Sequence, residues 1–374
     1  MKRLTMAAAI AVVLASAACG SAPVAPAAGR QGLALGFLGD SAPKTSSGGK
    51  KGAELAVEEY NRHADSTYRV SLKAETIDGS APDAARGADQ VSKTERLIGV
   101  VGELSDAGSQ AAALVLDKAG IPFLTTSTGG EAPPGAKSFR RLVAPAVQQG
   151  KALGLYANRT FPAGPALVMH DETPVGNDFS AGLKSAFDTA KRPIPRFERI
   201  NPKTDLEGLA GSIAFDPPMI LVFAGEGGLG ARFIEESRKA GYKGPIVVSP
   251  GILQAKPSGV ADGVITSSPI ADPADRGGAD FRARYRARFG SKPPPLALEA
   301  YEGASMLLEA IEEVEPKPKE LIEFLRFNRS FLGDSKDYEY DEKGDLKSLV
   351  VWLYQSKAGA WTFTGRSPAA ARSR

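Results

Sequence analysis

A chain of 374 residues is longer than one hydrophobic core usually supports, so the sequence favours two lobes over one large domain. Its composition, 43% hydrophobic and 24% charged residues, is that of a globular protein and excludes a largely disordered chain. The 46 basic residues nearly balance the 43 acidic ones, which argues against nucleic acid as a partner.

The first 18 residues have the pattern of a signal peptide. Lys2 and Arg3 precede an apolar run from Leu4 to Leu14, and small residues follow up to Ala18. The apolar run is shorter than the roughly 20 residues that a membrane-spanning helix needs. We therefore predict an exported protein without a transmembrane helix.

Cys19 is the only cysteine, so the chain can form no intramolecular disulfide. The segment Ser16-Ala17-Ala18-Cys19 resembles the lipobox of bacterial lipoproteins, although Ser16 stands where that motif prefers leucine. The resemblance implies that Cys19 carries a lipid and that residues 19–31, rich in Ala, Gly, Ser and Pro, form a flexible tether. The protein is then held to the outer face of the cell membrane by its lipid alone. Cleavage by the general signal peptidase is the alternative.

From residue 32 onward, short apolar runs alternate with longer helical patterns, which is typical of βαβ units around a parallel sheet. In residues 32–144 we expect strands over 33–38, 70–77, 98–101 and 122–125, with helices over 49–62, 84–93 and 107–119. In residues 145–274 we expect strands over 166–170, 196–200, 219–223, 245–249 and 263–266, with helices over 148–160, 177–190, 205–214 and 229–240. Each part predicts a doubly wound lobe.

Three helical patterns then follow without a strand between them, over 280–289, 296–314 and 319–327. We expect residues 275–330 to return to the first lobe. The period then changes to two, which predicts an antiparallel hairpin that turns at 341–345. Residues 331–365 are assigned to the second lobe and 366–374 to a disordered tail, so the chain crosses between the lobes near Ala144, Ala274 and Phe331.

Several short motifs are spread along the mature chain: Leu35-Gly36-Phe37-Leu38, Gly52-Ala53-Glu54-Leu55-Ala56, Gly99-Val100-Val101-Gly102, Gly120-Ile121-Pro122-Phe123 and Tyr340-Asp341. In this order and spacing they resemble the leucine/isoleucine/valine-binding protein family. The resemblance implies the α/β type I periplasmic binding fold, with two doubly wound parallel-sheet lobes joined by a three-crossover hinge. It also implies a monomer without cofactor or enzyme activity, which captures a small polar ligand, an amino acid or a related carboxylate or amide, for the permease of an ABC importer. A ligand sensor for a signalling partner is the alternative.

Two loops of the first lobe follow predicted strands, where ligands of open α/β sheets bind. Ser105 precedes a helix, whose unpaired N–H groups and macrodipole favour a carboxylate. Thr126, Ser127, Thr128 and Gly129 form the second loop. The family resemblance implies that Ser105, Ser127 and Gly129 hold the carboxylate and ammonium of an amino acid. The alternative is that Ser105 is only a helix N-cap and that the loop hydroxyls bond their own backbone.

The second lobe departs from the amino acid binders. Val175 and Glu226 stand where those proteins carry aromatic residues, and the acid that pairs with the ligand ammonium falls at about Gly251. Because an unpaired buried ammonium is costly, either Glu226 or Asp40 supplies a carboxylate or the ligand is not an α-amino acid.

The segment Gly225-Glu226-Gly227-Gly228-Leu229-Gly230 matches the dinucleotide-binding pattern G-x-G-x-x-G between a predicted strand and helix. The acid expected about 20 residues later is missing, so a tight turn is the favoured interpretation and a secreted nucleotide-dependent oxidoreductase the alternative. With His63 and His170 as the only histidines, we expect no metal site.

Overall fold

The computed structural model describes residues 30–40, 46–129, 133–255, 260–272, 274–275, 277–327 and 330–367. The predicted signal peptide, most of the tether and Cys19 lie outside these residues. Gln31, which we assigned to the tether, is instead the first residue of strand β1 and pairs with Tyr68. None of the described helices combines the length and apolar character needed to cross a membrane.

The first lobe is built on a five-stranded parallel sheet with the order β2-β1-β3-β4-β5. Its elements are β1 (Gln31–Asp40), α1 (Ser46–Arg62), β2 (Tyr68–Ile77), α2 (Ala81–Ser92), β3 (Leu97–Glu103), α3 (Asp106–Lys118), β4 (Phe123–Thr125) and β5 (Phe139–Arg141). The sequence predicted the first four strands and the three helices, while β5 is an additional short strand. Buried apolar residues cover both faces of this sheet.

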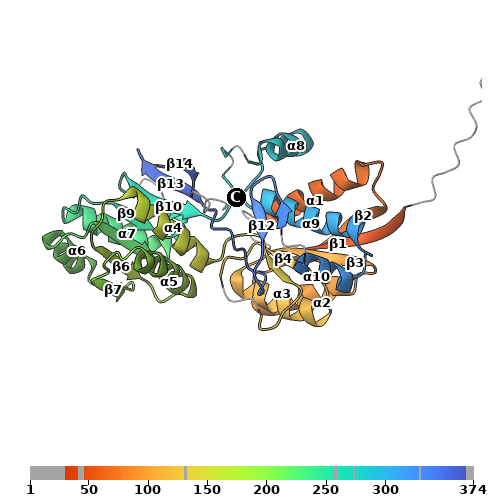
Figure 1. Ribbon diagram of the computed structural model, residues 1–374, viewed down its shortest axis with the longest axis horizontal. Helices are drawn as coiled ribbons and strands as arrows, with labels where there is room; N and C mark the ends of the chain where they lie inside the picture. The colour runs from red at the N-terminus through yellow and green to blue at the C-terminus, as the bar shows by residue number, and fades with distance from the viewer. Residues whose placement is uncertain are drawn as a thin grey trace, which may run out of the picture.

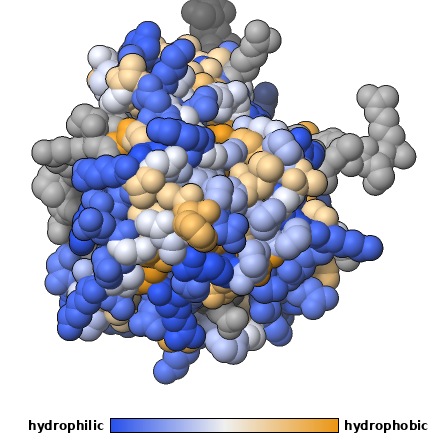
Figure 2. Space-filling model, turned by 90° about the vertical axis from the view of Figure 1, so that its left-hand side faces the viewer, coloured by the Kyte–Doolittle hydropathy of each residue, from blue (hydrophilic) through white to orange (hydrophobic). Residues whose placement is uncertain are grey.

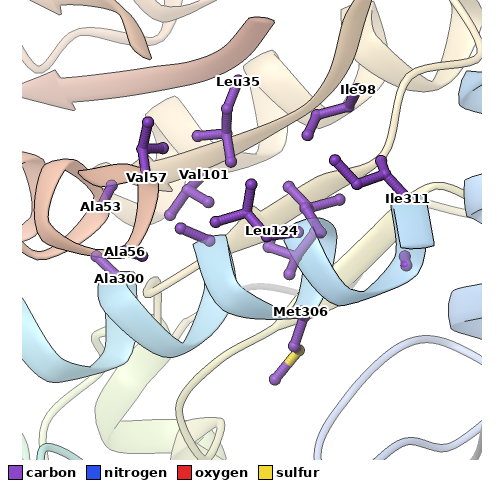
Figure 3. Packing of buried hydrophobic residues seen from close by; sticks show 14 of the residues in the cluster. Leu35, Ala53, Ala56, Val57, Ile98, Val101, Leu124, Ala300, Met306 and Ile311 are labelled. Atoms are coloured by element: carbon purple, nitrogen blue, oxygen red, sulfur yellow. The ribbon is translucent and has the colours of Figure 1, made fainter. Parts of the chain in front are cut away.

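Three helices follow the second lobe in the chain, namely α8 (Ala279–Phe289), α9 (Ala297–Glu313) and α10 (Pro318–Phe327). Helix α9 returns to the first sheet and packs beside α1, so that Leu35, Val101 and Leu124 of the sheet share one core with residues of α9 (Figure 3). The contact is close because α1 carries a glycine: a Cβ atom on Gly52 would lie 1.9 Å from the carbonyl oxygen of Ala297. This packing completes the first lobe from two distant parts of the chain.

The second lobe is built on a seven-stranded sheet with the order β14-β13-β10-β9-β8-β6-β7. Its elements are α4 (Ala146–Thr160), β6 (Ala166–His170), α5 (Pro174–Thr189), β7 (Arg196–Arg199), α6 (Leu206–Phe215), β8 (Ile220–Ala224), α7 (Gly227–Lys239), β9 (Ile246–Val248), the short 3-10 helix η1 (Pro250–Gln254), β10 (Val264–Ser268), β13 (Trp352–Lys357) and β14 (Ala360–Arg366). Strands β6 to β10 pair in parallel, and β13 adds to β10 in antiparallel direction. Figure 1 shows the two lobes side by side, which confirms the predicted fold class.

The third passage, meaning the third segment of chain that crosses from one lobe to the other, lies later in the sequence than we predicted. Residues 330–346 contribute the pair β11 (Ser330–Leu332) and β12 (Asp337–Glu339) and pack on the first lobe, where Tyr338 and Leu346 belong to its core. Val351 and Leu353 then belong to the core of the second lobe. The prediction near Phe331 was wrong because the burial of Tyr338 depends on distant residues.

The C-terminal hairpin also differs from the prediction. Tyr340 and Leu346 form a single bridge across the turn at 341–345, whereas the extended hairpin consists of β13 and β14. Its turn contains Ala358 and Gly359, both with positive φ, as tight hairpins require. Arg366 ends β14 and Ser367 is buried, so these two residues belong to the fold and not to the tail that we expected.

The surface at the end of the second lobe is mainly hydrophilic, with small apolar areas between the polar residues (Figure 2). Phe215 of α6 and Phe197 of β7 are among the exposed large apolar side chains of this lobe. Single exposed apolar residues of this kind are normal for soluble proteins.

Candidate functional site

The two predicted loops of the first lobe meet at the start of α3. Ser105 is the N-cap of this helix, and its Oγ accepts a hydrogen bond from the N–H of Gly108 at 3.1 Å. The same hydroxyl donates to the carbonyl oxygen of Gly79 at 2.9 Å. The N-cap that we considered is therefore present, and a ligand contact of Ser105 would be an additional role.

Asp106, the first residue of α3, bonds to the loop 126–129 that the sequence analysis assigned to the ligand. Its Oδ1 accepts hydrogen bonds from Ser127 Oγ at 2.8 Å, from the N–H of Thr128 at 3.2 Å and from the N–H of Gly129 at 2.8 Å. A Cβ atom on Gly129 would lie 2.0 Å from Asp106 Oδ2, so a side chain at this position would displace the Asp106 carboxylate. Sequence reasoning missed Asp106, although an acid directly after an N-cap serine was a visible signal.

Thr125, which ends β4, and Thr126, which begins the second loop, are buried, and their hydroxyl groups lie within hydrogen-bonding distance of neighbouring segments. Thr125 Oγ1 lies 2.8 Å from Ser109 Oγ, and Thr126 Oγ1 donates to the carbonyl oxygen of Gly102 at 3.3 Å. The carbonyl oxygen of Thr128 accepts from the N–H of Ala146, at the start of α4. The loop is therefore bonded both to the sheet of its own lobe and to the first passage into the second lobe.

Arg141, at the end of β5, ties the same loop to the third passage. This side chain is 1% exposed, and its Nη1 donates to the carbonyl oxygens of Ser127 at 2.8 Å and Gly129 at 3.2 Å. Its Nε donates to Asp345 Oδ1 at 2.7 Å. The candidate site and two of the passages between the lobes are thus connected through one guanidinium group.

The second lobe has a corresponding carboxylate at the end of β6. Asp171 is buried, and its Oδ1 accepts from the N–H of Thr173 at 3.1 Å and from Thr173 Oγ1 at 2.5 Å. Its Oδ2 accepts from the N–H of Glu226 at 2.6 Å. The strand ends of β6 and β8 are therefore joined through Asp171, another residue that the sequence analysis did not select.

The remaining predicted contacts do not join the cluster around Asp106. Val175 lies half-buried in the first turn of α5, and Glu226 is an exposed residue at the N-cap of α7. Both flank Asp171 in the second lobe. Asp40 ends β1, and its side chain is outside what the structure describes.

Close packing accounts for glycines of the G-x-G-x-x-G pattern. Gly225 has a φ of +148°, and a Cβ atom on Gly227 would lie 2.2 Å from the carbonyl oxygen of Gly251. A Cβ atom on Gly230 would lie 2.7 Å from the ring of Phe223. The tight-turn interpretation therefore explains these residues without a nucleotide. Within the described ranges no group of three or more His, Cys, Asp or Glu residues could hold a metal ion.

Buried charges lie where the chain passes between the lobes. Lys336 lies over the rings of Tyr338, at 4.7 Å, and Trp352, at 5.4 Å, and burial lowers the pKa of its ammonium group. Glu302 of α9 accepts from the N–H and Oγ of Ser335, both at 2.6 Å. Burial raises the pKa of the Glu302 carboxyl. Lys336 thus contacts Trp352 of the second lobe, while Glu302 and Ser335 lie within the first lobe, and none of the three belongs to the strand-end loops.

A cavity of about 830 Å³ lies away from the strand-end loops. Lys137, Arg140, Arg326 and Tyr340 are among the residues that line it. None of the residues predicted to contact the ligand lines this cavity, so we do not assign it to the site.

Comparisons with known proteins agree with this architecture. Residues 31–337 match the family model described as periplasmic binding protein. A leucine-, isoleucine-, valine-, threonine- and alanine-binding protein of Pseudomonas aeruginosa is 22% identical over 319 residues, 82% of this chain and 84% of that protein. Relatives of this kind are binding proteins and not enzymes, so the oxidoreductase alternative is not supported.

Solved structures share the fold. An ABC transporter substrate-binding protein of Desulfitobacterium hafniense in complex with Leu superposes with a TM-score of 0.76 at 20% identity, covering 89% of this chain and 100% of that one. A solute-binding protein of R. palustris in complex with benzoate gives 0.66 at 18% identity, covering 91% and 98%.

Proposed function

Because this chain belongs to the periplasmic binding protein family, we propose that it captures a small polar ligand between its two lobes and passes it to the permease of an ABC importer. The observation that carries the proposal is the match of one family model to residues 31–337, which include parts of both lobes. Polar loops at the strand ends of each lobe, around Asp106 and Asp171, supply groups that such a ligand needs.

The ligand class is wider than branched-chain amino acids. The relative from Pseudomonas aeruginosa is named for aliphatic and small amino acids, whereas the protein from R. palustris holds benzoate on the same fold. Amino acids, amides and carboxylates are therefore all candidates for this chain. Fold alone does not select among them, because specificity lies in the loops.

In the proposed mechanism the first lobe holds the ligand through Ser105 and the loop 126–129, and the second lobe closes over it with Val175 and Glu226. Asp40 is a further candidate contact. Closure is driven by ligand contacts that both lobes make at once, and the passages between the lobes act as the hinge. The permease then recognises the closed form. No covalent step is involved.

We further propose that the protein is an exported monomer, anchored through a lipid on Cys19 and a tether before β1. The motif Ser16-Ala17-Ala18-Cys19 supports the anchor.

The test is a thermal-shift screen of residues 20–374 against amino acids, amides, short peptides, carboxylates and sugars. A ligand at 100 times its Kd adds about 2.7 kcal/mol of stability, which raises the melting temperature measurably. If no compound raises it, simple ligand capture is contradicted.

Two matched variants, each lacking the side chain of one helix N-cap residue, then test where the ligand binds. Ser105 Oγ and Asp205 Oδ1 each accept from a backbone N–H at 3.1 Å at the start of a helix, α3 and α6 respectively. Replacing either residue by alanine costs about 1 kcal/mol of stability. We expect Ser105→Ala to abolish the ligand shift and Asp205→Ala to retain it.

A further inference from the structure

We propose that the ligand presents an amine or amide N–H group to the first lobe, and not a carboxylate, because Asp106 already supplies the carboxylate there. The inference rests on the proposed function and narrows its ligand class. It differs from the expectation that Ser105, Ser127 and Gly129 hold both the carboxylate and the ammonium of an amino acid, because it assigns only the N–H group of the ligand to this lobe.

Three hydrogen-bond donors of the loop already bond to the carboxylate of Asp106. Asp106 Oδ1 accepts from Ser127 Oγ, from the N–H of Thr128 and from the N–H of Gly129, at 2.8 to 3.2 Å. A ligand carboxylate that took the same donors would have to displace Asp106 and leave its charge without these partners. Removing hydrogen-bond partners from a half-buried charge is unfavourable, so the internal carboxylate competes effectively with an external one.

The position of Asp106 also stabilises its negative charge. It is the first residue of α3, where the helix macrodipole favours an anion. Arg141 contacts the same loop through the carbonyl oxygens of Ser127 and Gly129, while its Nε bonds to Asp345. The guanidinium group of Arg141 is therefore paired with another acid. A ligand carboxylate bound to the loop 126–129 would lie beside Asp106 and would be repelled by its negative charge.

The second lobe carries the same sign of charge at its strand ends. Asp171 is buried at the end of β6, and Glu226 is exposed beside it at the start of α7. Each lobe thus has a carboxylate at its strand ends, and this sign of charge complements a ligand with N–H donors or a positive charge. The acid missing at Gly251 is replaced by Asp106, from the other lobe.

The experiment uses residues 20–374 and matched pairs of probes, each consisting of a carboxylic acid or amino acid and its primary amide or decarboxylated amine. Leucine, leucinamide, 3-methylbutylamine and 4-methylpentanoate form one such set, and benzoate with benzamide forms another. Thermal shift identifies the binders, and titration calorimetry measures their Kd. We expect the binders to be amines or amides, with each matching acid weaker by at least about tenfold.

Two variants of α3 give the decisive comparison. Asp106→Asn removes the charge and should weaken amine binding by at least about tenfold while it strengthens carboxylate binding. Asp117 is the matched control, because its Oδ1 also accepts from one serine hydroxyl and two backbone N–H groups, at the other end of the helix. Asp117→Asn should leave the order of the Kd values among the probes unchanged.

Three outcomes separate the possibilities. Binding of 4-methylpentanoate or benzoate, which carry no N–H donor, to the unaltered chain, abolished by Ser105→Ala, overturns this inference and leaves the proposed function standing. The inference is also overturned if the order of the Kd values among the probes is the same in Asp106→Asn as in the unaltered chain. If neither these probes nor any compound of the wider thermal-shift screen binds, the proposed function fails and the inference fails with it.

Discussion

Asp106 and Asp117 lie at opposite ends of α3 and make the same kind of contact, since each carboxylate accepts from one serine hydroxyl and two backbone N–H groups. The first fixes the loop after β4, and the second fixes the segment that leads into β5. The helix is therefore bonded at both ends to the stretch of chain that contains the candidate site. The two acids differ in one respect: the macrodipole favours the charge of Asp106 and opposes that of Asp117.

This difference predicts unequal costs of removing the two charges. Either substitution to asparagine weakens charge-assisted hydrogen bonds, and we expect a loss of about 1–3 kcal/mol in the free energy of unfolding. Asp106→Asn should cost up to about 1 kcal/mol more than Asp117→Asn, because only Asp106 gains from the dipole. Urea denaturation at low ionic strength measures both, and a larger loss in Asp117→Asn would contradict the dipole argument.

Arg141→Ala should be among the most destabilising substitutions near the site. The variant leaves the Asp345 carboxylate and two carbonyl oxygens without the guanidinium group, and breaking a buried ion pair typically costs about 3–5 kcal/mol. Arg199→Ala is the control, since the Arg199–Glu172 pair is exposed and should contribute less than about 1 kcal/mol. Equal losses in the two variants, measured by urea denaturation, would show that burial does not set the strength of the first pair.

The helices and strands could be predicted from the sequence where the pattern of residues along a short stretch of chain determines them. Helix α9 was expected over 296–314 and spans Ala297–Glu313, because its long run of good helix formers without Pro is visible in the local sequence. Strand β5 was missed because Phe139-Arg140-Arg141 is short and contains two arginines, whose burial depends in part on distant partners such as Leu325 and Asp345. Asp106 was missed for the same reason, since its partners come from a loop about 20 residues later and local patterns do not encode such contacts.

Two reciprocal glycine contacts set the distance between α4 and α5. A Cβ atom on Gly182 would lie 1.9 Å from the carbonyl oxygen of Val147, and one on Gly150 would lie 1.9 Å from that of Phe179. Although alanine normally favours a helix, Gly182→Ala must separate the two helices, and we expect it to cost about 1–3 kcal/mol. Gly211→Ala in α6 is the control, because its Cβ atom would meet nothing within 4 Å and should stabilise the protein by up to about 1 kcal/mol. Calorimetric melting of both variants would decide, and a stabilised Gly182→Ala protein would contradict the close packing.

The lipid anchor gives a prediction independent of the fold. If Cys19 carries the lipid, the full chain expressed with its signal peptide should sediment with membranes and should partition into Triton X-114. Cys19→Ser should release it into the soluble extracytoplasmic fraction. Ser16→Leu, which restores the residue that the lipobox prefers, should increase the lipidated fraction. A membrane-bound Cys19→Ser protein would show that something other than this cysteine holds the chain.

Asp275 links the second passage between the lobes to the C-terminal hairpin and predicts how stability depends on pH. Burial raises the pKa of its carboxyl, but hydrogen bonds from Arg366 and from Trp352 Nε1, the latter at 2.5 Å, outweigh burial and hold the pKa below its ordinary value. The unfolded chain then binds more protons than the folded one in the acid range. The stabilisation is complete above the ordinary pKa of about 3.9 and is lost as the pH falls through the lower pKa of the folded state.

Asp275→Asn removes this contribution, so the difference in unfolding free energy between the unaltered chain and the variant should be constant from about pH 5 to 7 and should shrink at lower pH. Urea titrations from pH 2.5 to 7, followed by tryptophan fluorescence, give this difference directly. Arg366→Gln removes one of the groups that lower the pKa of Asp275 and should reduce the acid dependence without abolishing it, because Trp352 and the N–H of Gly277 still donate to the carboxylate. A difference that stays the same down to pH 2.5 would mean that the carboxylate gains no net stabilisation from these partners, and the hinge would then owe its stability to packing alone.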